Sequence, residues 1–216
     1  NWCFIRSIIV RVLSQIKNRV YRKELGVVLL YRLKDISFNS DTKNIQNISF
    51  KKSTNINEIL SFFGRMNKVS VNRESVEKWL SQGSDCWLFY HREKVIGGSW
   101  MLRGEFTITQ LTEHWLSRNL TVKFEADTLY RCYTIIDKDY RGQGIFCNFT
   151  QFLLDYYKKD PYINYVVFIT RASNAPIISI AMRHNAKLIG IIEVKSVLGK
   201  IMRKELFLDH KYRKWS

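Results

Sequence analysis

A run of seven residues, Asp139 to Ile145, has the composition of a loop that binds an anion. It reads Asp-Tyr-Arg-Gly-Gln-Gly-Ile, after a β-rich run at residues 128–136 and before a helical pattern at residues 145–158. Its two glycines lack a Cβ, so main-chain N–H groups can turn toward one ligand. The N-terminal dipole of the next helix and Arg141 both favour negative charge there. The run predicts a phosphate or diphosphate site; the alternative is a surface turn that carries two glycines.

Two other glycine-rich phosphate loops do not match this run. The P-loop pattern G-x-x-x-x-G-K-[ST] is absent from the chain. The dinucleotide fingerprint G-x-G-x-x-G lacks its third glycine, and no acidic residue closes a following strand at the right distance. We therefore expect a different class of phosphate loop.

The segments around the loop predict a domain of strands and helices. Apolar runs rich in β-branched residues predict strands at 26–33, 48–51, 86–91, 94–102, 128–136, 165–170, 187–197 and 202–208. Apolar residues at helical spacing, with polar caps, predict helices at 54–63, 72–82, 145–158 and 173–184. Residues 105–127 are ambiguous: 112–119 could form a short helix in an insertion, or the segment is an ordinary surface elaboration.

In this setting the loop resembles the pyrophosphate loop of the GCN5-related N-acetyltransferases (GNAT), whose pattern is Q/R-x-x-G-x-G/A. Arg141 and Gly144 fit this pattern, whereas the last position, usually a small residue, is Phe146. Asn174 at the start of the last expected helix also matches, and so does the Ile96-Gly97 step.

The resemblance covers about residues 45–210 and implies a fold. That fold is an α/β (α+β mixed) domain with a central, mostly antiparallel sheet of six to seven strands, flanked by helices. The sheet is splayed at one parallel pair, here the strands at 129–136 and 165–170.

The resemblance also implies an enzyme: an N-acyltransferase that uses an acyl-CoA, with acetyl-CoA the expected donor and no metal. The amine acceptor attacks the thioester directly. The acceptor is expected to be a small molecule, and the surplus of basic residues suggests an anionic one such as an amino-sugar nucleotide. The implied coenzyme-binding residues are Ile136, Arg141, Gly142, Gln143, Gly144, Ile145 and Asn174.

The catalytic groups are less clear from the sequence. Some relatives carry a glutamate base on the strand before the loop, and the matching position is Tyr130. Glu125, just upstream, is the preferred base, acting through water. Cys132 and Thr134 are expected on the same face as Tyr130 by the period of two; Cys132 is either a core residue or a nucleophile. The tyrosine acid of many relatives is matched by Ala181.

Composition bounds the partners and the compartment. The net charge is +16 over 216 residues, which implies an anionic partner, yet no nucleic-acid motif interleaves the basic residues, so nucleic acid is disfavoured. Four widely spaced cysteines without a C-x-x-C pair indicate reduced thiols and a cytoplasmic protein, and they disfavour a zinc site.

The N-terminal segment is expected to form an extension, residues 1–24, before an acyltransferase domain at 25–216. Apolar residues recur at helical spacing over residues 2–23, with arginines and lysines on the flanks. This amphipathic helix either lies peripherally on an anionic membrane or packs on the domain or on a second subunit of a homodimer. Because the chain begins at Asn1, whether its natural N-terminus is included stays open. A non-catalytic GNAT-like protein bound to membrane or nucleic acid is the alternative function.

Overall fold

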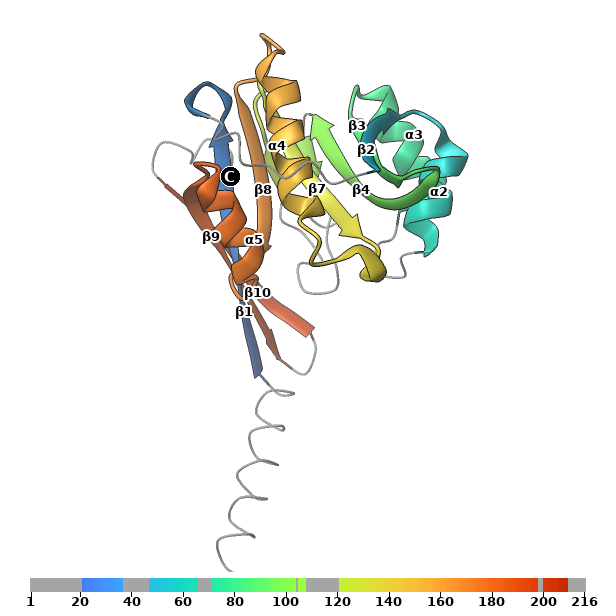
Figure 1. The fold of residues 1–216 in the computed structure, drawn as a ribbon. Coiled ribbons are helices and arrows are strands. Elements are labelled where there is room, and N and C mark those ends of the chain that lie inside the picture. The colour runs from blue at the N-terminus through green and yellow to red at the C-terminus, as the bar shows by residue number, and fades with distance from the viewer. Residues whose placement is uncertain are drawn as a thin grey trace, which may run out of the picture.

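The computed structural model describes residues 21–36, 47–65, 71–103, 105–107, 121–197 and 200–209. Within them, eight strands form one mixed sheet in the order β10-β9-β1-β8-β7-β4-β3-β2 (Figure 1). The strands are β1 (Tyr21–Arg32), β2 (Ile48–Ser53), β3 (Asp85–His91), β4 (Lys94–Arg103), β7 (Thr128–Ile136), β8 (Tyr165–Arg171), β9 (Lys187–Val197) and β10 (Lys200–Leu208). A separate two-stranded sheet joins β5 (Glu105–Thr107) to β6 (Thr121–Lys123).

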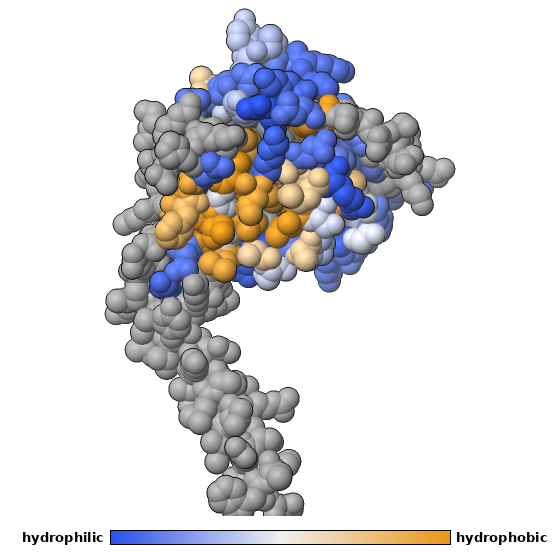
Figure 2. Space-filling view, turned by 90° about the vertical axis from the view of Figure 1, so that its left-hand side faces the viewer, coloured by the Kyte–Doolittle hydropathy of each residue, from blue (hydrophilic) through white to orange (hydrophobic). Residues whose placement is uncertain are grey.

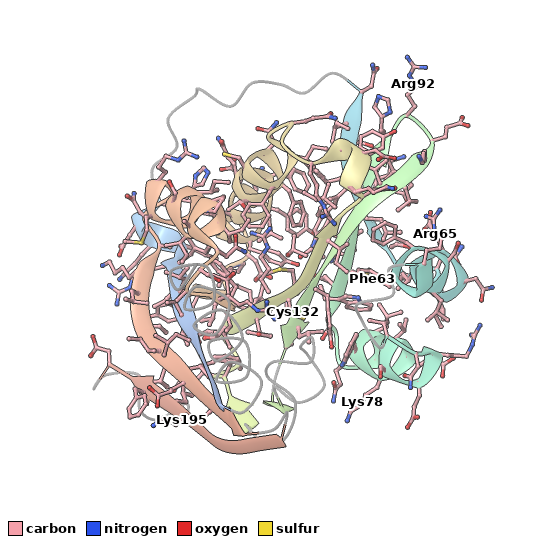
Figure 3. The ribbon with its side chains drawn as sticks, turned by 90° about the horizontal axis from the view of Figure 1, so that it is seen from below. Phe63, Arg65, Lys78, Arg92, Cys132 and Lys195 are labelled. Carbon is pink, nitrogen blue, oxygen red and sulfur yellow. The ribbon has the colours of Figure 1, made fainter. Side chains whose placement is uncertain are left out.

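Four helices cover the two faces of the large sheet in the described part of the chain. They are α2 (Ile56–Arg65), α3 (Arg73–Ser81), α4 (Ile145–Lys158) and α5 (Ala175–Arg183). One buried cluster joins α2 and α3 to one face of the sheet, and a second cluster joins α4 and α5 to the other face. In Figure 3, Phe63 of α2 lies between its helix and the sheet, while Arg65 and Lys78 lie on the outer side of their helices.

The expected mixed, mostly antiparallel sheet with one parallel pair is confirmed. Among the described strands only β7 and β8 are parallel. The sheet has eight strands instead of six to seven, because β1 and the β9–β10 hairpin all pair into it. The expected N-terminal helix is wrong at its end, since Tyr21 to Lys23 belong to β1 and pair with β9. The rest of that helix, and the expected helix at 112–119, lie outside the described residues.

Asparagine side chains set the helix boundaries that the sequence indicated. Asn55 Oδ1 accepts hydrogen bonds from the amides of Asn57 and Glu58, at 3.1 and 3.2 Å, before α2. Asn72 Oδ1 accepts from the amide of Ser75 at 2.8 Å before α3. Each bond satisfies an amide that the first turn of a helix cannot pair internally. After α5 the sequence places an asparagine, which tolerates the left-handed conformation that commonly ends a helix, and Asn185 has a φ of 61°.

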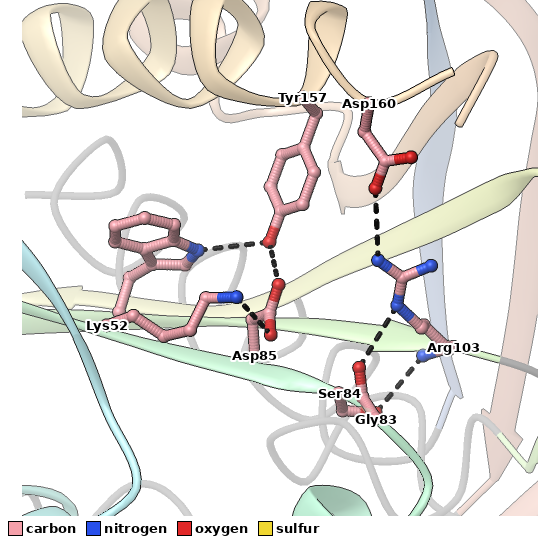
Figure 4. Close-up of polar contacts among 8 residues, drawn as sticks. Lys52, Gly83, Ser84, Asp85, Arg103, Tyr157 and Asp160 are labelled. Atoms are coloured by element: carbon pink, nitrogen blue, oxygen red, sulfur yellow. Dashed lines mark hydrogen bonds and ion pairs between the residues drawn. The ribbon is translucent and has the colours of Figure 1, made fainter. Parts of the chain in front are cut away.

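The C-terminal end of α4 is held against the sheet by a buried polar cluster (Figure 4). Tyr157 donates a hydrogen bond to Asp85 of β3 and accepts one from the Trp87 indole at 3.1 Å. Asp85 also forms an ion pair with Lys52 of β2, at 2.9 Å. Burial acts to lower the pKa of Lys52, but the bonds to Asp85 outweigh it and the pKa is raised. These contacts fix α4 across the sheet, with its N-terminus at the opposite end.

One side of the molecule carries exposed apolar side chains (Figure 2). Leu25 of β1, Met182 of α5 and Leu188 of β9 are each at least two-fifths exposed. Ile191 and Phe207 are also exposed and pair across β9 and β10. The side of the sheet that α5 only partly covers therefore presents an apolar area to solvent.

Candidate functional site

The parallel strands β7 and β8 are paired over only part of their length. Thr128–Arg131 of β7 pair with Tyr165–Phe168 of β8, and no pairing between the two strands follows. β7 continues to Ile136 against β4, and β8 continues to Arg171 against β1. Each strand follows its outer neighbour, so the two diverge (Figure 1). After Arg131, the described strands show no further pairing between β7 and β8, so an extended ligand could pair along this edge of β7.

A bulge in β7 lies in this open part. Tyr133 has a φ of 48°, and the pairing of β7 with β4 shifts register at this point. The hydroxyl of Ser99 in β4 donates to the carbonyl of Cys132 at 3.4 Å and lies 2.8 Å from the Thr134 hydroxyl. A bulge of this kind bends the strand and re-aims its main-chain groups. The bend therefore occurs just where the gap opens.

The bulge corrects one expectation from the sequence. Tyr130 and Cys132 share a face, as expected, and it is the face toward α2 and α3, but Thr134 does not share that face. The Thr134 hydroxyl instead accepts a hydrogen bond from Arg131 Nε, at 3.1 Å, on the α4 side. The expected period of two is wrong here because one extra residue in β7 moves every later side chain to the other face.

The glycine loop follows β7 at the open end of the gap. Gly142 and Gly144 have φ values of 76° and 79°, and Gly144 is the N-cap of α4. Such φ values favour glycine. Among the described residues, none of the main-chain amides of residues 142–147 donates a hydrogen bond. Together with the dipole of the 14-residue helix α4, these amides form an anion-binding arrangement.

Two side chains of the loop, Arg141 and Gln143, donate hydrogen bonds to nearby main-chain carbonyls. Arg141 is exposed, and its Nε donates to the carbonyl of Ile136 at 2.9 Å. Gln143 Nε2 donates to the carbonyl of Asp139 at 3.2 Å. After β8, Asn174 is the N-cap of α5, and its Nδ2 donates to the Thr170 hydroxyl at 3.1 Å. All seven predicted coenzyme-binding residues thus lie at the open end of β7 and β8, and their binding role stays a prediction.

The predicted catalytic residues lie elsewhere. Glu125 is exposed and precedes β7, where its carbonyl accepts from the amide of Thr128 at 2.9 Å. It therefore lies at the closed end of the strand pair, away from the loop. Tyr130 is 2% exposed, its ring stacks on Phe124, and burial raises the pKa of its hydroxyl. The fold does not bring either side chain to the loop, and their catalytic roles stay predictions.

Cys132 behaves as a core residue. It is labelled near the middle of the sheet in Figure 3 and is 7% exposed. Burial raises the pKa of its thiol well above the ordinary value, and Cys86 raises that pKa further by a smaller amount. Because the thiolate is the nucleophilic form, this surrounding disfavours the nucleophile interpretation.

Sequence reasoning missed Arg131, which lies beneath the first turn of α4. It is 3% exposed, and its Nη1 donates to the Thr150 hydroxyl at 2.9 Å. The guanidinium carbon lies 4.4 Å from the centre of the Phe146 ring and 5.0 Å from that of Phe149. Burial lowers the pKa of Arg131 to about 10, so it is charged at neutral pH. The only sequence signal was one arginine inside an apolar strand.

This contact explains why Phe146 is tolerated in the loop pattern. Its ring turns inward and packs over the Arg131 guanidinium. Nearby, Cys147 Sγ lies 3.5 Å from His184 Nε2, which links α4 to the end of α5. Burial, then Arg183 and Arg131, lower the pKa of His184, so its imidazole is neutral at neutral pH.

The described residues lack two features that would change the interpretation of the site. No helix among them is long and apolar enough to cross a membrane. In the same part of the chain, no group of three or more histidine, cysteine, aspartate or glutamate side chains could hold a metal ion.

Comparisons with known proteins identify similar folds but no similar sequence. No protein-family model and no curated protein matches the chain. A GCN5-related N-acetyltransferase from Kribbella flavida matches with a TM-score of 0.54 and 6% identity, over 82% of this chain and 59% of that one. A GCN5-related N-acetyltransferase from Sphaerobacter thermophilus matches with a TM-score of 0.55 and 12% identity, over 87% and 56%.

A third similar structure is a region of a fungal multi-domain protein. It is described as a GCN5-related glucosamine N-acetyltransferase region in a GH3 β-N-acetylglucosaminidase, and it matches with a TM-score of 0.55 and 12% identity, over 88% of this chain and 23% of that one. The chain spans less than two thirds of the length of each of these structures. At such identities the likeness concerns the fold alone.

Proposed function

We propose that this chain, which has the fold of the GCN5-related N-acetyltransferases, is an acyl-CoA-dependent N-acyltransferase. One observation carries the proposal: the only parallel strand pair among the described strands opens beside a loop whose main-chain amides are free. The gap offers a strand edge to the amide groups of a pantetheine arm. The loop offers N–H groups and a helix dipole to a diphosphate.

The coenzyme would be held by residues from both strands. Ile136 and the open part of β7 would pair with the pantetheine arm, and Asn174 would face it from the end of β8. Residues 142–145 would surround the diphosphate with main-chain amides, and Arg141 would add positive charge at the mouth of the loop. When bound, the coenzyme supplies the thioester that an amine can attack.

The transfer forms a C–N bond to the acyl carbon and breaks its C–S bond, so that the free thiol leaves. A base must first take a proton from the ammonium form of the acceptor. Glu125 acting through water stays the proposed base, with Tyr130 at the position that matches the strand glutamate of some relatives. A main-chain N–H of the bulge would polarise the thioester carbonyl. The acceptor is proposed to be a small, anionic amine such as an amino-sugar nucleotide, because the chain carries a charge of +16.

A pair of charge-reversal variants tests the coenzyme site. Arg141→Glu removes one charge-assisted contact, worth about 1.5–3 kcal/mol, so titration calorimetry should show acetyl-CoA binding about tenfold to a hundredfold weaker. Arg65→Glu is the matched control, since Arg65 is also exposed and donates from Nε to a main-chain carbonyl, that of Ser61. Equal coenzyme affinity in the two variants would refute the assignment of the loop.

The alternative function is a GNAT-like binding protein without turnover. It is favoured by Ala181, which is fully buried and leaves the position of the usual tyrosine acid without a hydroxyl. Release of free CoA thiol from acetyl-CoA in the presence of an amine would eliminate this alternative. A screen of amines, amino acids and amino-sugar nucleotides would identify the acceptor at the same time.

A further inference from the structure

Among the described residues, Arg131 is a buried positive charge without a counter-ion. Its side-chain hydrogen bonds to the described residues go to two neutral hydroxyls, those of Thr134 and Thr150. No acidic side chain of the described residues forms an ion pair with it, and its Nη2 atom has no hydrogen-bond partner there. Burying a charge without a partner costs several kcal/mol, and the stacking on Phe146 offsets only part of this. Such an arrangement is expected where an anionic ligand completes it.

A second unpaired donor lies beside it. Tyr31 of β1 is 0% exposed, and its hydroxyl has no hydrogen-bond partner in the described part of the chain. The Tyr31 ring stacks on Phe168, with ring centres 5.7 Å apart, and Phe168 is the cross-strand partner of Arg131. Burial raises the pKa of Tyr31 and the charge of Arg131 opposes this effect, so the two groups interact. The hydroxyl therefore stays protonated and remains a donor.

These two donors lie at the inner end of the gap. Arg131 and Phe168 are the last paired residues of β7 and β8, and the strands separate immediately after them. The loop that would hold the diphosphate lies at the outer end, after Ile136. A coenzyme arm that enters beside the loop and follows β7 inward therefore brings its acyl end toward Arg131.

We propose that Arg131 and Tyr31 form a subsite for a carboxylate at the far end of the acyl chain. The preferred donor is then the CoA thioester of a short dicarboxylic acid, and not acetyl-CoA. This inference rests on the proposed function. One carboxylate oxygen accepts from Arg131 Nη2 and the other from the Tyr31 hydroxyl, which pairs both orphan donors and neutralises the buried charge. Phe146 is half-buried over the guanidinium, and its rotation would admit the carboxylate.

Three coenzymes that differ at the end of the acyl chain test the proposal: succinyl-CoA, butyryl-CoA and acetyl-CoA. Succinyl and butyryl chains have the same number of carbons, and only the first ends in a carboxylate. With the full chain, titration calorimetry should show succinyl-CoA binding at least tenfold more tightly than butyryl-CoA. Arg131→Met should abolish this preference and leave butyryl-CoA affinity within about threefold of the wild type. Tyr31→Phe should reduce the preference and not abolish it.

The variants are chosen so that misfolding cannot imitate the result. Methionine fills much of the volume of the arginine stem without burying a charge, so Arg131→Met should unfold at the same or a higher temperature without ligand. Arg65→Met is the control for loss of one positive charge, because Arg65 is exposed on α2. It should keep the full preference for succinyl-CoA.

Each outcome decides between the two ideas. Equal binding of succinyl-CoA and butyryl-CoA, or a preference that survives in Arg131→Met, overturns the carboxylate subsite and leaves the proposed function standing. The carboxylate subsite is also overturned if Arg131 proves to be needed for a carboxylate on the amine acceptor, and not for one on the acyl group. If none of the three coenzymes binds, the proposed function itself fails.

Discussion

Gly97 allows a close approach between β4 and the open part of β7. A Cβ at this position would lie 2.4 Å from Phe89 Cδ2 and 2.9 Å from the carbonyl oxygen of Ile135. The Phe89 ring cannot move away easily, because it is fully buried and its centre lies 4.2 Å from that of Phe149. The carbonyl of Ile135 belongs to the backbone beside the bulge. Gly97→Ala must therefore displace either the core or the strand that borders the gap.

The size of the effect follows from these contacts. Overpacking of a core costs about 1–3 kcal/mol, and the reduced entropy of the unfolded chain returns about 0.4–1 kcal/mol for a glycine-to-alanine change. We expect Gly97→Ala to lower the free energy of unfolding by about 1–2 kcal/mol. If β7 shifts, the affinity for acetyl-CoA should fall as well.

Gly64→Ala is the matched control. Gly64 lies in α2, and nothing lies within 4 Å of a Cβ added there. The same change should therefore stabilise the protein by about 0.5–1 kcal/mol and leave coenzyme affinity unchanged. Urea denaturation of the two variants and the wild type measures all three free energies. A Gly97→Ala protein as stable as the wild type would refute the packing argument, and so would a destabilised Gly64→Ala protein.

Three further predictions concern the anchor of α4, the pH dependence and the N-terminal segment. Tyr157→Phe should cost about 1–3 kcal/mol in urea denaturation, because Asp85 loses a buried donor; a change under about 0.5 kcal/mol would contradict the role of the cluster. The pKa of His184 lies below its ordinary 6.5 in the folded state, so the unfolded chain binds more protons and stability should fall as the pH drops below 6.5. His184→Gln should flatten that dependence in denaturation curves recorded from pH 5 to 7, and an unchanged slope would contradict the assignment. Removing residues 1–20, which spares β1 from Tyr21 onward, should abolish co-sedimentation with anionic lipid vesicles; binding that persists would refute the proposed membrane contact.

The sequence by itself determined the features that depend on neighbouring residues. The Gly-x-Gly step, the asparagine caps and the left-handed Asn185 all follow from backbone preferences within a few positions, and the structure has them where the pattern placed them. Apolar periodicity also identified the eight strands, since each must bury at least one face. The end of the N-terminal helix was wrong because pairing with β9 overrides helical periodicity at Tyr21.

Only the tertiary structure decided how these elements form a site. The gap exists because β7 follows β4 while β8 follows β1, and no local pattern in either strand encodes that choice of neighbours. The bulge at Tyr133 reversed the face of Thr134, and it depends on the partner strand as much as on β7 itself. The surroundings of Arg131 under α4 come from residues distant in sequence, such as Thr150, which accepts its hydrogen bond, and Tyr31, which interacts with its charge. A charge acquires chemical meaning from its surroundings, and those surroundings are assembled only when distant segments pack together.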